Sequence, residues 1–170
     1  MSETASRERL QPSLLDRLTD NAPDQTRESF DQQTLTLRGL RQAVLRDLTW
    51  LLNTTHLAAT EDLSALPRVA VSTLNYGIPA LTGRTGMAGR VGGLDADLLM
   101  VIRAFEPRIQ PDTLEIRVGH GASADSAIPT LSFEIRGELW AQPVPEQLFL
   151  ETAIDLETRL AVVADKRSRG

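Results

Sequence analysis

The stretch LDADLLMVIRAFEPRIQPDTLEIRV, residues 94–118, contains a change of hydrophobic period that sets the architecture of the chain. Over residues 94–105 the apolar side chains recur at three- and four-residue steps, which predicts a helix with one buried face. Pro107 lacks an N–H and disfavours helical geometry in the residue before it, so the helix is predicted to end near Glu106. From residue 114 to 118 apolar and charged residues alternate, which predicts a half-buried strand.

A second amphipathic helix is predicted upstream, over residues 37–52. Apolar residues at helical spacing form its predicted buried face: Leu37, Leu40, Val44, Leu48, Leu51 and Leu52. The opposite face carries Arg38, Arg41, Gln42 and Asp47, which we interpret as solvated surface.

Further strands are predicted downstream, where alternation resumes over residues 131–136 and where apolar runs occupy residues 147–154 and 160–163. The last two are separated by residues 155–159, a length that suits a hairpin loop. Helices followed by a run of strands predict an α+β fold, with two main helices packed on a small antiparallel, or mixed, sheet.

The polar composition of the N-terminal region predicts a mobile arm over residues 1–31, before a single α+β domain over residues 32–165 and a charged tail over residues 166–170. Within the arm, Ser13 can cap a short helix that carries an apolar cluster. Whether this cluster packs on its own domain or on another protein is left open. Its members are Leu14, Leu15 and Leu18.

Composition excludes several classes of function. A net charge of -5 argues against nucleic acid as a partner, and the absence of cysteine excludes disulfides, thiolate nucleophiles and Cys-ligated zinc. His56 and His120 have no neighbouring ligands at metal spacing, so no metal or cofactor is expected. The glycine-rich connection over residues 65–93 lacks a nucleotide-binding motif. Neither a signal peptide nor a membrane-spanning run is recognisable, so we expect a cytoplasmic protein without direct membrane insertion.

The Glu106-Pro107-Arg108 segment is the principal candidate site. A carboxylate in the last turn of a helix faces the negative end of the helix dipole and calls for a cation nearby. Glu106 and Arg108 can pair with each other, or both can reach outward to partners. A glycosidase would need a general acid at Glu106 that stays protonated, which an adjacent cation such as Arg108 would oppose, and no second carboxylate is selected by spacing. We therefore expect no catalytic residue and no enzyme.

Four segments in this order resemble the TssE family, the type VI secretion baseplate subunits related to the lysozyme-like wedge proteins of contractile phage tails. They cover SLLDRL (13–18), LRDLTWLLNT (45–54), STLNYGIP (72–79) and FEPRI (105–109). The resemblance implies the α+β domain already predicted. Two positions depart from the pattern: Ala80 replaces a frequent acidic residue, and Arg159 replaces a frequent hairpin glycine.

The resemblance implies a structural role in which Glu106, Pro107 and Arg108 hold the subunit against the helical core bundle of other wedge subunits (TssF, TssG, TssK). It also implies that the sheet serves as the first template for the tail sheath subunits (TssB, TssC), within a baseplate docked at the inner membrane. We place Leu14, Leu15, Asp16, Arg17 and Leu18 in the partner-binding set as well. On this view, Glu106→Ala should leave the fold intact and weaken partner recruitment.

Overall fold

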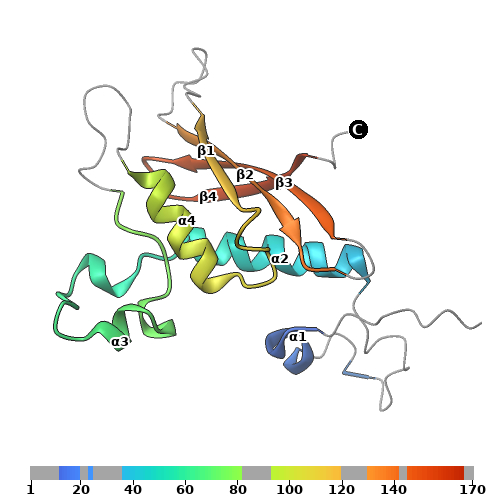
Figure 1. The fold of residues 1–170 in the computed structure, drawn as a ribbon, viewed down its shortest axis with the longest axis horizontal. Coiled ribbons are helices and arrows are strands. Elements are labelled where there is room, and N and C mark those ends of the chain that lie inside the picture. Colours follow the sequence, from blue (N-terminus) through green and yellow to red (C-terminus); the bar gives the residue numbers. More distant parts are fainter. Residues whose placement is uncertain are drawn as a thin grey trace, which may run out of the picture.

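The computed structural model describes residues 12–19, 23–24, 36–81, 93–119, 130–141 and 145–166. Most of the predicted N-terminal arm, the glycine-rich segment 82–92, His120 and the tail after residue 166 lie outside the described residues. Two main helices, α2 (Leu37–Leu52) and α4 (Leu94–Phe105), lie on one face of a four-stranded sheet (Figure 1). The predicted α+β fold is confirmed.

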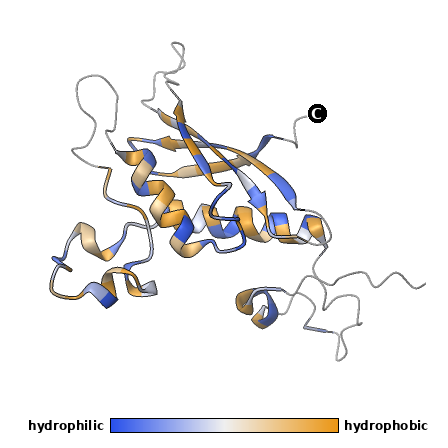
Figure 2. Ribbon diagram, in the orientation of Figure 1, coloured by the Kyte–Doolittle hydropathy of each residue, from blue (hydrophilic) through white to orange (hydrophobic). Residues whose placement is uncertain are grey.

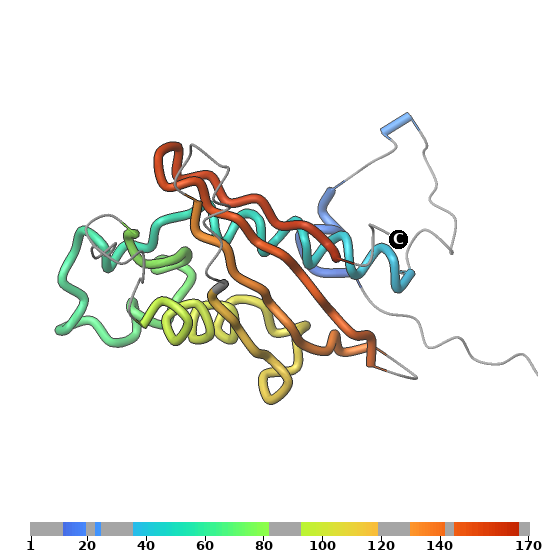
Figure 3. The backbone as a smooth tube through the Cα atoms, turned by 90° about the horizontal axis from the view of Figure 1, so that it is seen from above, coloured from blue at the N-terminus to red at the C-terminus, as the bar shows by residue number. Residues whose placement is uncertain are grey.

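The sheet is an antiparallel meander in the order β1-β2-β3-β4, seen along its length in Figure 3. No parallel pair occurs between its strands, so the sheet is not mixed. The central strands are ten residues long each, which exceeds the predicted lengths. The strands are β1 (Glu115–Gly119), β2 (Thr130–Leu139), β3 (Glu146–Asp155) and β4 (Ala161–Asp165).

The core lies between the sheet and the two helices, where their buried apolar side chains form one cluster. Figure 2 shows which residues of these elements are hydrophobic. Both helices bury residues at the predicted spacing, and alternate residues of β2 are buried along the strand. Leu37 is the exception: it is exposed, because it lies in the first turn of α2 beyond the sheet. The fully buried large side chains are Phe133, Leu48, Leu51, Leu52, Leu94, Leu98, Ile102, Ile109, Ile135, Leu139, Leu148 and Leu150.

The connection over residues 65–93 was predicted to be irregular, but its described part contains two short helical turns, α3 (Pro67–Ala70) and η2 (Thr73–Asn75). A third turn, η1 (Leu57–Ala59), precedes it. The side chain of Asn75 joins them, since it accepts a hydrogen bond from the Ala58 N–H and donates one to the Ala70 carbonyl. A short polar side chain thus gives order to a segment without hydrophobic periodicity.

The short turns η1, α3 and η2, which we call the lobe, are joined to the end of α2 at Gly77. Gly77 has a φ of +126°, and a Cβ built there would lie 2.5 Å from the Thr54 carbonyl oxygen. Ile78 donates to that same oxygen at 2.8 Å, and His56 donates to the Ile78 carbonyl at 3.1 Å. The close approach of the two backbones therefore requires glycine.

Arg41 and Asn53 tie α2 to the edge strand β4, so the interpretation of Arg41 as solvated surface is wrong. The Arg41 guanidinium pairs with Asp165 and with Glu146, the latter at 3.1 Å. At the other end of the helix, the Asn53 amide donates to the Ala161 carbonyl and accepts from the Ala161 N–H, both at 2.9 Å.

The hairpin between β3 and β4 turns at Arg159, which has a φ of +61°. This left-handed conformation favours glycine, so the position flagged as a departure does carry a backbone that glycine adopts more readily. The Asp155 carboxylate supports the turn by accepting from the N–H groups of Glu157 and Thr158, which lowers the pKa of Asp155.

Candidate functional site

Glu106 and Arg108 pair with each other across the end of α4. Arg108 Nε donates to Glu106 Oε1 at 2.6 Å and Arg108 Nη2 donates to Oε2 at 2.5 Å, a bidentate pair. Glu106 is only 2% exposed, whereas the Arg108 side chain remains 22% exposed. Of the two possibilities considered from the sequence, mutual pairing is the one observed.

The backbone after Pro107 is held against the end of β2, which sets the position of Arg108. Trp140 donates its N–H to the Arg108 carbonyl at 2.8 Å, and Gln110 donates to the Glu138 carbonyl at 2.8 Å. Between them Ile109 pairs with Leu139, and its side chain is buried. The helix thus ends before Pro107, and the chain then turns into an isolated antiparallel bridge at Ile109.

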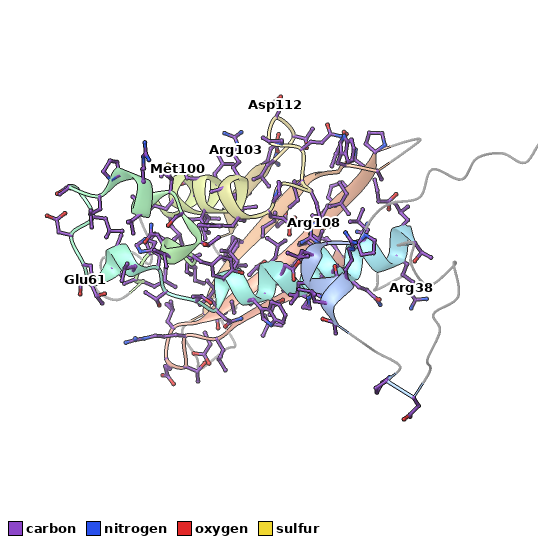
Figure 4. The ribbon with its side chains drawn as sticks, turned by 90° about the horizontal axis from the view of Figure 1, so that it is seen from below. Arg38, Glu61, Met100, Arg103, Arg108 and Asp112 are labelled. Atoms are coloured by element: carbon purple, nitrogen blue, oxygen red, sulfur yellow. The ribbon has the colours of Figure 1, made fainter. Side chains whose placement is uncertain are left out.

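A chain of ion pairs runs from Glu106 to the N-terminal helix α1 (Leu14–Leu18), and we call it the ionic chain. Arg108 Nη2 donates to Asp47 Oδ2 at 2.5 Å, Asp47 Oδ1 lies 2.8 Å from Arg46, and Arg46 Nη1 donates to Asp16 Oδ1 at 2.6 Å. In Figure 4 the labelled Arg108 lies where α1 meets α2. Asp47 is therefore not the solvated decoration predicted from its helix face.

The electrostatics of the ionic chain favour its charged forms. Burial lowers the pKa of Arg108, but the hydrogen bonds and charges of Glu106 and then Asp47 raise it more, so the pKa lies above its ordinary value. The pKa of Arg46 is raised in the same way, chiefly by its hydrogen bond to Asp47. Both guanidiniums thus stay charged at every accessible pH.

Tyr76, which follows the η2 turn, contacts the ionic chain at Asp47. Its hydroxyl donates to the Asp47 carbonyl at 3.3 Å, and its ring packs edge-on against Phe105 with centroids 5.2 Å apart. Burial, and then the charges of Asp47 and Glu106, raise the pKa of Tyr76. The STLNYGIP segment therefore both fixes the lobe and supports the site.

Helix α1 attaches to the domain through its polar side. Ser13 caps it, accepting from the Asp16 N–H at 3.3 Å, and Asp16 pairs with Arg46 on α2. Its apolar side chains are directed away from the domain: Leu14 is 71% exposed, Leu15 45% and Leu18 74%. The predicted cluster therefore does not pack on the described part of its own domain.

The attachment of α1 should depend on the charge of Asp16. Burial raises the pKa of Asp16, but hydrogen bonds from Ser13 and Arg46, with the charges of Arg46 and Arg108, lower it further, so the pKa lies below its ordinary value of 3.8. A lowered carboxylate pKa stabilises the attached state above the ordinary value, and this contribution is lost as the pH falls through the lowered pKa.

We therefore expect Asp16→Asn to weaken the attachment by about 1 kcal/mol or less at pH 7, as for a partly exposed ion pair. Hydrogen exchange of residues 13–19 would measure this, with faster exchange in the variant and the difference shrinking below pH 3.8. Equal exchange at pH 7 would mean that another contact holds α1.

The carboxylates of the ionic chain are occupied by arginines. Both oxygens of Glu106 are engaged by Arg108, and Asp47 is engaged by Arg108 and Arg46. Among the described residues, no group of three His, Asp or Glu side chains could hold a metal ion. None of the helices in these ranges has the length and apolarity to cross a membrane.

The sequence singled out Glu106, Pro107 and Arg108, but it did not single out Arg46, Asp47, Tyr76 or Trp140 as parts of one site. Arg46, Asp47 and Tyr76 stand in segments that carried the family resemblance, and that was the only signal for them. For Trp140 the sequence held no signal, because its place opposite Arg108 depends on the pairing of distant segments.

Comparison with known families supports a structural assignment. Residues 38–144, more than half of the chain, match the family model of the baseplate wedge protein gp25. The match includes Asp47, Tyr76 and the Glu106-Pro107-Arg108 segment, whereas α1, β3 and β4 lie outside it. No curated protein and no solved structure matches the chain. The chain belongs to the baseplate wedge protein gp25 family, and its role is that of a structural baseplate subunit.

Proposed function

We propose that this chain is a TssE-type subunit of a type VI secretion baseplate, that it binds the core bundle of TssF, TssG and TssK through the ionic chain and α1, and that its sheet anchors the first TssB and TssC subunits of the sheath. Its place of action is the cytoplasmic side of the inner membrane. The family match and the resemblance seen in the sequence support the assignment to a contractile baseplate. The geometry of Arg108 supports its place in the binding interface.

The position of Arg108 is the observation that carries the proposal. A partly exposed guanidinium held by a buried glutamate and by Asp47 is preorganised, because little side-chain entropy remains to be lost on binding. Glu106 itself is too buried to touch a partner in this conformation. In the proposal Arg108 makes the contact, and Glu106 positions it.

Arg108→Lys tests this interface, because lysine keeps the charge and loses the planar bidentate geometry. We expect the variant to bind the purified TssF–TssG complex at least tenfold more weakly than wild type. Arg136→Lys is the matched control, since Arg136 pairs with Glu134 at the same sequence separation on the outer face of the sheet. Equal affinity of the two variants would remove Arg108 from the interface.

For sheath anchoring we assign strand addition to the β1 edge. Strand addition needs unpaired N–H and C=O groups, and at β4 the outward groups of Ala161 are already bonded to Asn53. Among the described residues, no side chain bonds to the backbone of β1.

The lack of cysteine in the chain makes this assignment testable by single-cysteine labelling. Benzophenone attached at Arg117→Cys on β1 should cross-link to sheath subunits during assembly, and the same label at Val162→Cys on β4 should not. Both side chains are exposed, at 61% for Arg117 and 64% for Val162. Cross-linking from β4 alone would reverse the assignment.

A further inference from the structure

Both tryptophans of the chain are exposed, and both lie beside an arginine of the ionic chain. Trp50 is 49% exposed and Trp140 is 62% exposed. An aromatic ring of this size is usually largely buried, and exposed tryptophans are enriched among the residues that dominate protein–protein binding.

The two rings are placed by different elements. Trp50 lies on α2, one turn after Arg46, and the Arg46 guanidinium sits over its ring at 5.1 Å from the centroid. Trp140 follows β2 and lies directly opposite Arg108, with its N–H bonded to the Arg108 carbonyl. Because Asp47 joins Arg46 to Arg108, both tryptophans contact arginines of one connected polar cluster, Trp50 through its ring and Trp140 through its backbone.

Helix α1 adds an outward face next to this cluster. Leu14 and Leu18 are four positions apart and share one side of the helix, Arg17 flanks them, and Asp16 points the other way toward Arg46. Arg17 is exposed and makes no ion pair with any described residue. The surface thus combines apolar anchors with a free cation, although the whole chain carries a net charge of -5.

The backbone of this surface is already paired. The N–H of Trp140 and the carbonyl of Arg108 bond each other, and the backbones of α1 and α2 are bonded within the helices. These bonds favour a partner that binds through side chains, as a helix does with its apolar face. Arg46 is already paired with Asp16 and Asp47, so the exposed Arg17 is the cation that favours an acidic residue beside that face.

We infer that Trp50, Trp140 and the Leu14–Leu18 face of α1 form one docking surface for an acidic amphipathic helix of a neighbouring wedge subunit. This inference rests on the proposed function. It adds Trp140 and gives Trp50 a contact role, and it names the kind of partner helix that the already predicted Leu14–Leu18 segment would meet. The tryptophans supply most of the binding, and Arg17 accelerates association by attracting the acidic partner.

The test measures binding of the purified TssF–TssG complex to variants of the full chain. Trp50→Ala and Trp140→Ala should each weaken Kd at least tenfold, Trp140→Phe should restore most of the loss, and Arg17→Glu should slow association. Val162→Ala and Met100→Ala, which shorten equally exposed apolar side chains elsewhere, should bind as wild type. Thermal unfolding confirms that each variant is folded.

Tryptophan variants that bind within twofold of wild type, while Arg108→Lys binds weakly, would overturn this inference and leave the proposed interface standing. Wild type that fails to bind the complex would overturn both. Benzophenone attached at Trp140→Cys should cross-link to an acidic amphipathic helix, and a cross-link to a strand or to a basic segment would contradict the partner that we name.

Discussion

Glu106→Ala is expected to lower the free energy of unfolding by about 3 kcal/mol, because it removes one member of a buried ion pair and leaves the Arg108 guanidinium without its principal partner. This reverses the expectation from the sequence that the variant would keep its fold intact. Urea denaturation of the purified protein gives the difference directly, as a lower midpoint with an unchanged slope.

Glu115→Ala is the matched control. Glu115 also pairs with an arginine two positions on, but its side chain is 59% exposed and that of Arg117 is 61% exposed. Exposed pairs contribute little, so this variant should stay within about 0.5 kcal/mol of wild type. If Glu106→Ala lowered the free energy of unfolding as little as Glu115→Ala, the Glu106–Arg108 pair would contribute no more than an exposed ion pair. The positioning role of Glu106 would then be wrong.

Gly77→Ala is the second variant with a large expected effect. It should lower the free energy of unfolding by about 2–4 kcal/mol, because the new Cβ would lie 2.5 Å from the Thr54 carbonyl oxygen and 2.8 Å from the His56 nitrogen. Backbone atoms on both sides cannot yield without breaking the bonds that join the lobe to α2. Loss of those bonds should also displace Tyr76 and so loosen Asp47.

The comparison for Gly77 is Gly93→Ala. Gly93 also has a positive φ, of +79°, but a Cβ there would meet nothing within 4 Å. Its cost should be about 1–2 kcal/mol, from the left-handed conformation alone. Thermal or urea unfolding of both variants separates the two causes, and equal losses would show that the contact with Thr54 is unimportant.

The sequence was sufficient for the elements that local rules determine. Residues 37–52 and 94–105 form helices with the predicted bounds, because the hydrophobic period and Pro107 act within a few residues of the chain. The first two strands were predicted from their alternation and the last two from apolar runs, although β2 and β3 extend beyond the predicted bounds. The strand order and the register were not predicted; the order proves to follow the chain, as sequential strands often do.

The site was predictable only in part. Glu106 and Arg108 are two positions apart, so their pairing could be anticipated, but Asp47 is 61 positions from Arg108 and Asp16 is 30 from Arg46. Ion pairs between distant segments leave no periodic trace. For the same reason Arg41 and Asp47 were read as solvated, since a polar residue on a polar helix face looks the same whether water or another element covers it.

The role of Arg108 in binding wedge subunits is tested most directly by affinity purification of the tagged chain from its native host. The amounts of baseplate and sheath subunits recovered are compared for wild type, Arg108→Lys and the control Arg136→Lys. We predict that wild type and Arg136→Lys recover wedge and sheath subunits, while Arg108→Lys, although folded, recovers about tenfold less of both. Full recovery by Arg108→Lys, or no wedge subunit with wild type, would contradict it.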